Sequence, residues 1–184
     1  MESFSSLGAA RNTHLVQQLR TWLTERLRFI HSPLQQLNSH LNGSQYPLVL
    51  CHAVLEWLAD PAAAIAELKQ WVAPGGMLSL MFYNKDAHRF SNILYGNFDY
   101  VKADMRVKKP VRLNPQQPLA SAEVLVWCQQ AGFSLLSKTG VRCFHDYLRD
   151  RSQQQSHYSE VEALELQYNR QEPYASLGRY THFI

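Results

Sequence analysis

The stretch Tyr46–Trp57, with the sequence YPLVLCHAVLEW, decides the fold class of this chain. Its first part, residues 47–51, is too short for a buried helix and too evenly apolar for a strand with one wet face, so it predicts a parallel strand covered on both faces. Open α/β sheets bind ligands just beyond the carboxyl ends of such strands. His52 stands there, where it either satisfies backbone groups at a turn or contacts a ligand.

The segments on either side of this strand predict repeated β and α elements. Asp60 and Pro61 indicate the start of a helix over residues 62–72, which Pro74-Gly75-Gly76 ends before a second buried strand over residues 77–83. Upstream, the pattern predicts an amphipathic helix over residues 15–27, a short strand over residues 28–31 and a helical turn over residues 34–37. The fold class is therefore α/β, with a doubly wound sheet.

Residues 85–118 interrupt this alternation. They carry the aromatic sequence GNFDY and then four cations in seven residues, Arg106, Lys108, Lys109 and Arg112. A connection this long inside a compact domain is typical of a lid or a binding element. The basic run is either a solvated face or a surface that contacts phosphates beside stacking aromatic side chains.

The rest of the chain resumes the regular pattern. It predicts a helix over residues 120–131, a strand over residues 133–138, a helix over residues 159–168 and a terminal strand over residues 178–184.

Composition limits the class of protein. The 184 residues, 46% of them hydrophobic, suit one domain with a real core, and a net charge of +3 permits a polyanionic partner without requiring one. The three cysteines, Cys51, Cys128 and Cys143, have no CxxC spacing, so we expect reduced thiols in a cytoplasmic protein and no metal site. No apolar stretch approaches the roughly 18 residues of a membrane span, so we expect no membrane partner.

From Phe29 onward the chain resembles S-adenosylmethionine-dependent methyltransferases, and closely the tRNA 5-carboxymethoxyuridine methyltransferases. The resemblance rests on five motifs: HAVLEWLADP (52–61), APGGMLSLMFYN (73–84), GNFDYV (96–101), KTGVRCFHDYLR (138–149) and RQEPYASLGRYTH (170–182). The first motif with PGG alone marks only the wider superfamily, and the later motifs are more specific. The resemblance implies a single Rossmann-like class I methyltransferase domain over residues 1–184, with an antiparallel terminal strand and residues 85–118 as a basic lid.

The resemblance also implies what the sequence does not contain. The family opens with a strand that carries a glycine-rich loop, followed by a strand that ends in an acid for the ribose hydroxyls, and neither pattern precedes Phe29. We therefore expect a domain truncated at its N-terminus, with a sheet that lacks its first two strands and has two unpaired edges. Autonomous activity of such a chain is in doubt.

The implied reaction is methyl transfer from S-adenosyl-L-methionine to the carboxylate of 5-carboxymethoxyuridine at the tRNA wobble position, which forms a methyl ester. A carboxylic acid with a pKa near 3.9 is already ionised at neutral pH, so the reaction needs alignment and desolvation more than a general base. One alternative is a methyltransferase of the same superfamily that acts on a small carboxylic acid. Another is a non-catalytic tRNA-binding or partner-dependent protein.

The resemblance assigns candidate residues to each part of the site. Since their strands start or finish at one edge of the sheet, catalytic roles are expected for Tyr83, Arg142, His145 and Arg179. Contact with the cofactor is expected for Leu34, Gln35 and His52, and contact with the tRNA anticodon stem-loop for Tyr100, Lys108, Lys109, Arg112 and Tyr147. Each arginine is alternatively an ion-pair partner of Asp146, Asp150 or Glu172.

Overall fold

The computed structural model describes residues 28–106 and 117–184, and the chain divides between residues 42 and 43 into two units. In the first unit, the described residues form a 3₁₀ turn, η1 (Leu34–Gln36), and a short helix, α2 (Asn38–Leu41), which confirms the helical turn expected there. The helix expected over residues 15–27 lies outside the described residues. The strand expected over residues 28–31 is wrong, because residues 28–33 have no regular secondary structure. So short a strand needs neighbouring strands, and residues 28–31 pair with none of the described strands β1 to β4.

The second unit begins with the predicted β–α–β crossover. It consists of β1 (Tyr46–His52), the 3₁₀ turn η2 (Leu55–Trp57), α3 (Pro61–Trp71) and β2 (Val72–Tyr83). Asp60 caps α3, since its Oδ1 accepts a hydrogen bond from the Ala63 N–H at 2.9 Å. The turn expected at PGG lies inside β2 instead of before it. Tyr46 pairs with Val72 and Leu48 with Met77, so β2 bulges there, and Gly75 adopts the positive φ of 72° that the bulge needs.

Residues 85–118, expected to be a long loop, contain two helices in their described part. These are α4 (Lys85–Leu94) and α5 (Phe98–Lys102). Asn84 begins α4, because its side-chain oxygen accepts from the Asp86 N–H at 3.0 Å, and this local cap lets a helix start directly after β2. The helix α6 (Ser121–Gln130) then follows, as predicted.

The C-terminal part contains the last two strands of the sheet. Its elements are β3 (Lys138–Val141), η3 (His145–Tyr147), α7 (Gln153–Ser156), α8 (Tyr158–Tyr168), α9 (Tyr174–Leu177) and β4 (Tyr180–Phe183). The predicted helix over residues 159–168 and the terminal strand are confirmed. The strand expected over residues 133–138 is displaced, because pairing with β4 begins only at Lys138, opposite Phe183, and Leu136 instead donates to the last carbonyl, of Ile184.

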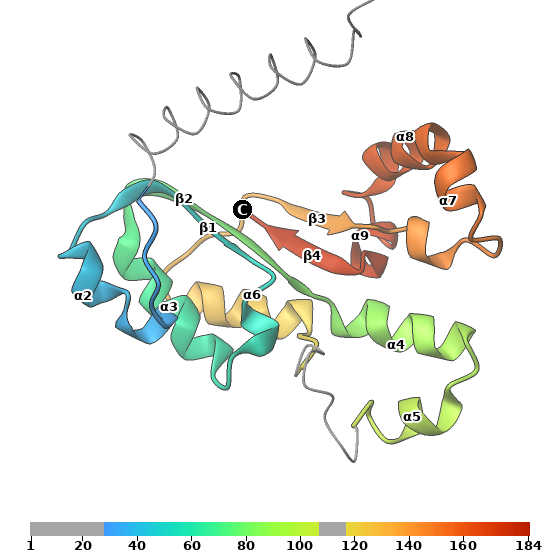
Figure 1. Ribbon diagram of the computed structural model, residues 1–184, viewed down its shortest axis with the longest axis horizontal. Coiled ribbons are helices and arrows are strands. Elements are labelled where there is room, and N and C mark those ends of the chain that lie inside the picture. Colours follow the sequence, from blue (N-terminus) through green and yellow to red (C-terminus); the bar gives the residue numbers. More distant parts are fainter. Residues whose placement is uncertain (1–27, 107–116) are drawn as a thin grey trace, which may run out of the picture. The chain divides into compact units, whose positions relative to one another are not determined.

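The described strands form one open sheet in the order β1-β2-β4-β3 (Figure 1). β1 runs parallel to β2, and β4 is antiparallel to both β2 and β3. Hence β1, β2 and β3 all point the same way, and β4 enters the sheet from their carboxyl edge. The antiparallel terminal strand is confirmed, and the open α/β sheet fits the partial Rossmann-like sheet that was predicted.

The two faces of the sheet differ in their cover. Helices α3 and α6 pack together on one face, where the buried side chains include Ile65, Leu68, Leu80, Phe82, Val124, Cys128 and Phe183. On the other face Leu48 and Leu50 of β1 are 48% and 63% exposed, whereas Cys51, which faces the helices, is 4% exposed. The prediction that residues 47–51 are covered on both faces is therefore wrong, because both helices that follow this strand pack on one side.

Two further expectations concern cysteines and membranes. Cys51, Cys128 and Cys143 are unpaired and buried, which confirms that they are free thiols. Within residues 28–106 and 117–184, none of the helices has the length and apolar character needed to cross a membrane.

Candidate functional site

Three strand ends meet at the carboxyl edge of the sheet. Tyr83 ends β2, Arg142 follows β3 and Arg179 precedes β4, and the register aligns Tyr83 and Val141 with Tyr180. Backbone hydrogen bonds join the three ends, since the Asn84 N–H donates to the Arg179 carbonyl at 3.0 Å and the Arg179 N–H donates to the Arg142 carbonyl at 3.3 Å. The topology thus places the two predicted arginines and Tyr83 side by side.

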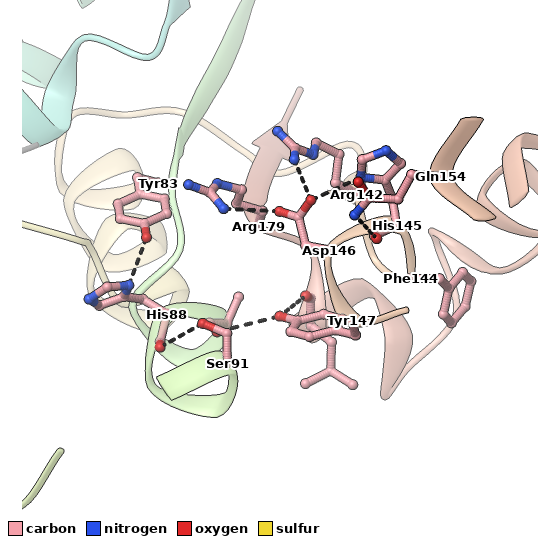
Figure 2. Close-up of polar contacts among 12 residues, drawn as sticks. Tyr83, His88, Ser91, Arg142, Phe144, His145, Asp146, Tyr147, Gln154 and Arg179 are labelled. Atoms are coloured by element: carbon pink, nitrogen blue, oxygen red, sulfur yellow. Dashed lines mark hydrogen bonds and ion pairs between the residues drawn. The ribbon is translucent and has the colours of Figure 1, made fainter. Parts of the chain in front are cut away.

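The two arginines converge on Asp146 (Figure 2). The Asp146 Oδ1 accepts from the Arg142 guanidinium and lies 3.0 Å from the His145 Nδ1, while its Oδ2 accepts from Arg179 at 3.1 Å. We call Tyr83, Arg142, His145, Asp146 and Arg179 the arginine cluster. Of the open alternatives for the arginines, an ion pair with Asp146 is therefore present for both.

The electrostatics of the arginine cluster leave it cationic. Burial alone would raise the pKa of Asp146, but the hydrogen bonds from His145 and Arg142 outweigh burial and lower the pKa below its ordinary value. The carboxylate is thus ionised at neutral pH. The two guanidinium groups and the one carboxylate together carry a net charge of +1. Both arginine side chains are 45% exposed, and each guanidinium has five N–H donors, so both keep donors for a ligand.

Tyr83 belongs to a short chain of polar side chains. Its hydroxyl lies 2.7 Å from the His88 Nδ1, and the His88 Nε2 lies 3.2 Å from the Tyr100 hydroxyl. Burial, and then the charge of Arg179, lower the pKa of His88, so the imidazole is neutral at pH 7. Asn92 donates to the Nδ1 at 3.4 Å, which makes Nδ1 the acceptor and Nε2 the donor. The Tyr83 hydroxyl therefore donates to His88, which donates to Tyr100.

A small cavity of about 40 Å³ adjoins the arginine cluster. Its lining includes Tyr83, His88, Tyr147 and Arg179. The Arg179 guanidinium carbon lies 5.6 Å from the centre of the Tyr83 ring, a cation–π distance that fixes the ring beside the charge. Burial raises the pKa of Tyr83, so its hydroxyl stays protonated near neutral pH. The cavity thus offers the charged donors of Arg179, beside an uncharged tyrosine ring, to a group of a few atoms.

Tyr147, expected to contact RNA, is held within the unit. Its hydroxyl donates to the Leu177 carbonyl at 2.8 Å, and its ring packs edge-on to Phe90 with the ring centres 5.3 Å apart. Burial raises its pKa. Tyr100 is half-buried at the end of the polar chain from Tyr83. Lys108, Lys109 and Arg112 lie outside the described residues.

His52, expected to contact the cofactor, ends β1 and is exposed at the same carboxyl edge. Its Nε2 lies 2.8 Å from the hydroxyl of Ser79 on β2, which in turn lies 2.7 Å from the Nε2 of His182 on β4. A histidine–serine–histidine row therefore crosses three strands, on the face of the sheet that α3 and α6 leave open. Leu34 and Gln35, also expected to contact the cofactor, both lie in η1 of the other unit.

Two residues of the site were not assigned a role from the sequence. His88 is five residues beyond Tyr83, and no pattern marks it before the start of α4 is known. Glu165 lies in α8 and bonds the backbone that follows Arg142, a contact between residues 22 apart. Asp146 was anticipated as one of three possible partners for the arginines.

Comparison with known proteins gives the class first. The model of the methyltransferase domain matches residues 5–80. The matched range includes β1, α3 and most of β2, so this part of the open α/β sheet is similar to a methyltransferase domain.

The more specific resemblance extends over most of the chain. It is 47% identical over 160 residues to the tRNA 5-carboxymethoxyuridine methyltransferase of Escherichia coli K12, and 46% identical over 160 residues to the protein of that name from Escherichia coli O157:H7. Each match covers 87% of this chain and 61% of the relative. The chain is a relative of these enzymes, as its motifs predict, and spans about three-fifths of their length.

Proposed function

We propose that the protein acts in S-adenosylmethionine-dependent methyl transfer to the carboxylate of 5-carboxymethoxyuridine at the wobble position of tRNA in the cytoplasm. The observation that carries this proposal is the arginine cluster at the carboxyl edge of the sheet, in which the guanidinium groups of Arg142 and Arg179 bind the Asp146 carboxylate. The Tyr83 ring lies beside Arg179. The names of the curated relatives support the same substrate.

The residues present fit part of the cofactor. His52 is exposed at the carboxyl edge, and its Nδ1 is not engaged by Ser79, so it suits a contact to S-adenosylmethionine. The glycine-rich strand and the ribose-binding acid of the family do not occur in this sequence. When bound, the cofactor supplies a methyl group on a sulfonium. The work of this chain is to bind and orient the carboxylate that receives the methyl group.

The arginine cluster can orient a carboxylate without deprotonating it. Its net charge of +1 matches one carboxylate, and the planar guanidinium donors of Arg142 and Arg179 fix the angle of that group. Hydrogen-bond donors on the carboxylate oxygen that attacks the methyl group would withdraw electron density from it. We therefore propose that the arginines bind mainly the other oxygen of the substrate carboxylate. The protonated Tyr83 hydroxyl, turned towards His88, fixes the tyrosine ring as a wall of the cavity.

The tRNA side of the proposal rests on the segment after β2. Tyr100 in α5 and the basic residues Lys108, Lys109 and Arg112 would contact the anticodon stem-loop, the tyrosine by stacking and the cations at phosphates. Hydrogen bonds through His88 join Tyr100 to Tyr83. The proposed RNA contact at α5 is therefore connected to the arginine cluster.

A methyl-transfer assay tests the proposal. The protein is incubated with methyl-labelled S-adenosylmethionine at millimolar concentration and tRNA that carries 5-carboxymethoxyuridine, with the same tRNA lacking the carboxymethoxy group as control. We expect label only on the first tRNA, as a base-labile methyl ester. Base-stable label would contradict the proposal, and so would labelling of small carboxylic acids without tRNA. tRNA binding with no transfer would favour a non-catalytic, partner-dependent role.

Arg142→Lys sharpens this assay. Lysine keeps the charge but loses the planar pair of donors, so the carboxylate stays attracted and loses its angle to the methyl group. We expect the single-turnover rate on saturating tRNA to fall by about 10²-fold, with a smaller loss of tRNA affinity. A normal rate with weaker binding would make Arg142 an anchoring residue.

A further inference from the structure

The loop between β3 and η3 directs three consecutive backbone N–H groups at one side chain. The Glu165 Oε2 accepts from the Cys143 N–H at 2.7 Å, and its Oε1 accepts from the N–H groups of Phe144 and His145 at 2.8 and 3.0 Å. A carboxylate with three backbone donors is tightly held, because hydrogen bonds to a charged acceptor are stronger than neutral ones.

The backbone of this loop has an unusual conformation at its first residue. Arg142 has a φ of +63°, the left-handed region that side-chain-bearing residues seldom adopt. Successive N–H groups in such a turn form a concave anion-binding nest. Glu165 fills that nest from α8, so its carboxylate compensates three donors that the turn would otherwise leave unpaired.

The same loop is held from two other elements. The Phe144 ring packs against Tyr174 of α9, with the ring centres 5.4 Å apart, and the Gln154 amide of α7 donates to the His145 carbonyl at 2.9 Å. These contacts fix the flanks, while Glu165 fixes the backbone directly after Arg142. Since Arg142 and His145 both reach Asp146 from this loop, its conformation decides where their side chains point (Figure 2).

We propose that Glu165 is a positioning residue for the carboxylate-binding site. It holds the loop in the left-handed turn that turns Arg142 and His145 towards Asp146 and Arg179, and so fixes the donors that a substrate carboxylate meets. The inference rests on the proposed function for the identity of that carboxylate. Glu165 itself touches no substrate and acts through Arg142.

The test compares Glu165→Gln with Glu162→Gln. Both carboxylate oxygens of Glu165 accept hydrogen bonds, and glutamine replaces one of them with an NH₂ group. At least one of the three backbone N–H groups then meets a donor instead of an acceptor. Glu162, on the same helix, is exposed and accepts only from the Tyr158 hydroxyl at 3.3 Å, which makes it a matched control. Affinity is measured for two anticodon stem-loop RNAs that differ only in the carboxymethoxy group of the wobble uridine.

We expect wild type and Glu162→Gln to prefer the carboxylate-bearing RNA by about 10-fold, the equivalent of one charge-assisted contact, and Glu165→Gln to lose most of this preference while still binding RNA. A wild-type preference that Glu165→Gln retains would overturn the inference. No preference in wild type would instead overturn the proposed function. In that case the guanidinium NMR signals of Arg142 decide, because we expect Glu165→Gln, and not Glu162→Gln, to shift them, and unchanged signals would overturn the inference.

A measurement on the wild type covers failure of the variant to fold. If Glu165 holds the loop, the amide protons of Cys143, Phe144 and His145 exchange with solvent at least about 10²-fold more slowly than free amides. Exchange at the rate of free amides would overturn the inference.

Discussion

The two ends of the sheet differ in how completely their polar groups are paired and their apolar side chains are covered. At β3 and β4 the carboxyl edge is joined by backbone bonds, and each polar atom of the Asp146 carboxylate has a donor. At β1 the face opposite α3 and α6 exposes Leu48 and Leu50, and His52 projects at an edge strand of the described sheet. The part assigned to the substrate is thus complete in its contacts, and the part assigned to the cofactor is open.

This difference between the two ends of the sheet matches the separate roles that we propose for them, cofactor binding near β1 and substrate binding near β3 and β4. The resemblance implies that a glycine-rich strand and an acid for the ribose hydroxyls bind the cofactor in the family. The sequence before Phe29 contains neither pattern. The residues assigned to the substrate carboxylate lie at the end of β2, directly before β4, and in the loop and turn that follow β3. We propose that the chain orients a carboxylate by itself and holds the cofactor poorly by itself.

The largest expected contrast is between two leucines on opposite faces of the sheet. Leu80 of β2 is 1% exposed under the helices, whereas Leu50 of β1 is 63% exposed. We expect Leu80→Ala to lower the free energy of unfolding by about 2–5 kcal/mol, through lost burial and a cavity. Leu50→Ala should cost less than about 1 kcal/mol. Urea unfolding of both variants measures this, and a comparable loss for Leu50→Ala would show that its face is covered.

A smaller effect is expected for Asp146→Asn, which removes the charge between the arginines. Because both arginines are partly exposed and screened, we expect a loss of about 1–2 kcal/mol at pH 7. The lowered pKa of Asp146 means that its stabilisation is present above the ordinary value of 3.8 and is lost as the pH falls through the lower, folded-state value. The gap between wild type and variant should therefore close as the pH falls below 3.8 and through the folded-state pKa.

Asp99→Asn is the matched control for Asp146→Asn, because Asp99 is fully exposed and pairs with Lys102 only at 3.9 Å. Asp99→Asn should leave the free energy of unfolding unchanged both at pH 7 and in acid. A gap for Asp146→Asn that persists unchanged in acid would mean that packing, and not charge, holds the cluster.

The smallest effect concerns Lys108, Lys109 and Arg112, which we expect to bind phosphates. Replacing all three with alanine should weaken tRNA binding and flatten its dependence on salt, because each cation that no longer neutralises a phosphate lowers the log–log slope by nearly one unit. Binding titrations at several salt concentrations measure the slope. A slope equal to that of wild type would make these residues part of a solvated surface.

Local sequence signals predicted much of this unit. The cap at Asp60 and the apolar runs located α3, α6, β1 and most of β2, and parallel topology brought Arg142 and Arg179 to Tyr83, whereas the cap at Asn84 that starts α4 was missed. What failed depends on neighbours that a local pattern does not contain. Residues 28–31 have strand composition but no regular structure, and residues 47–51 are apolar enough for two covered faces although one is open.

The candidate site shows the same limit. Residue types pointed to the arginines, yet their common partner Asp146 was one of three carboxylates that the sequence left open. Glu165 was not found at all, because its role depends on a left-handed turn at Arg142 and on a contact across 22 residues. Such contacts are set by tertiary packing, for which neither periodicity nor capping gives a signal.

Isothermal titration of the chain with each ligand tests the central claim most directly. Two or three absent hydrogen bonds, each worth about 1.5–3 kcal/mol where charge-assisted, remove several decades of affinity for S-adenosylmethionine. We therefore predict no micromolar binding of S-adenosylmethionine to this chain, together with measurable binding of the anticodon stem-loop that carries 5-carboxymethoxyuridine. Micromolar binding of S-adenosylmethionine, or no binding of the RNA, would contradict the account.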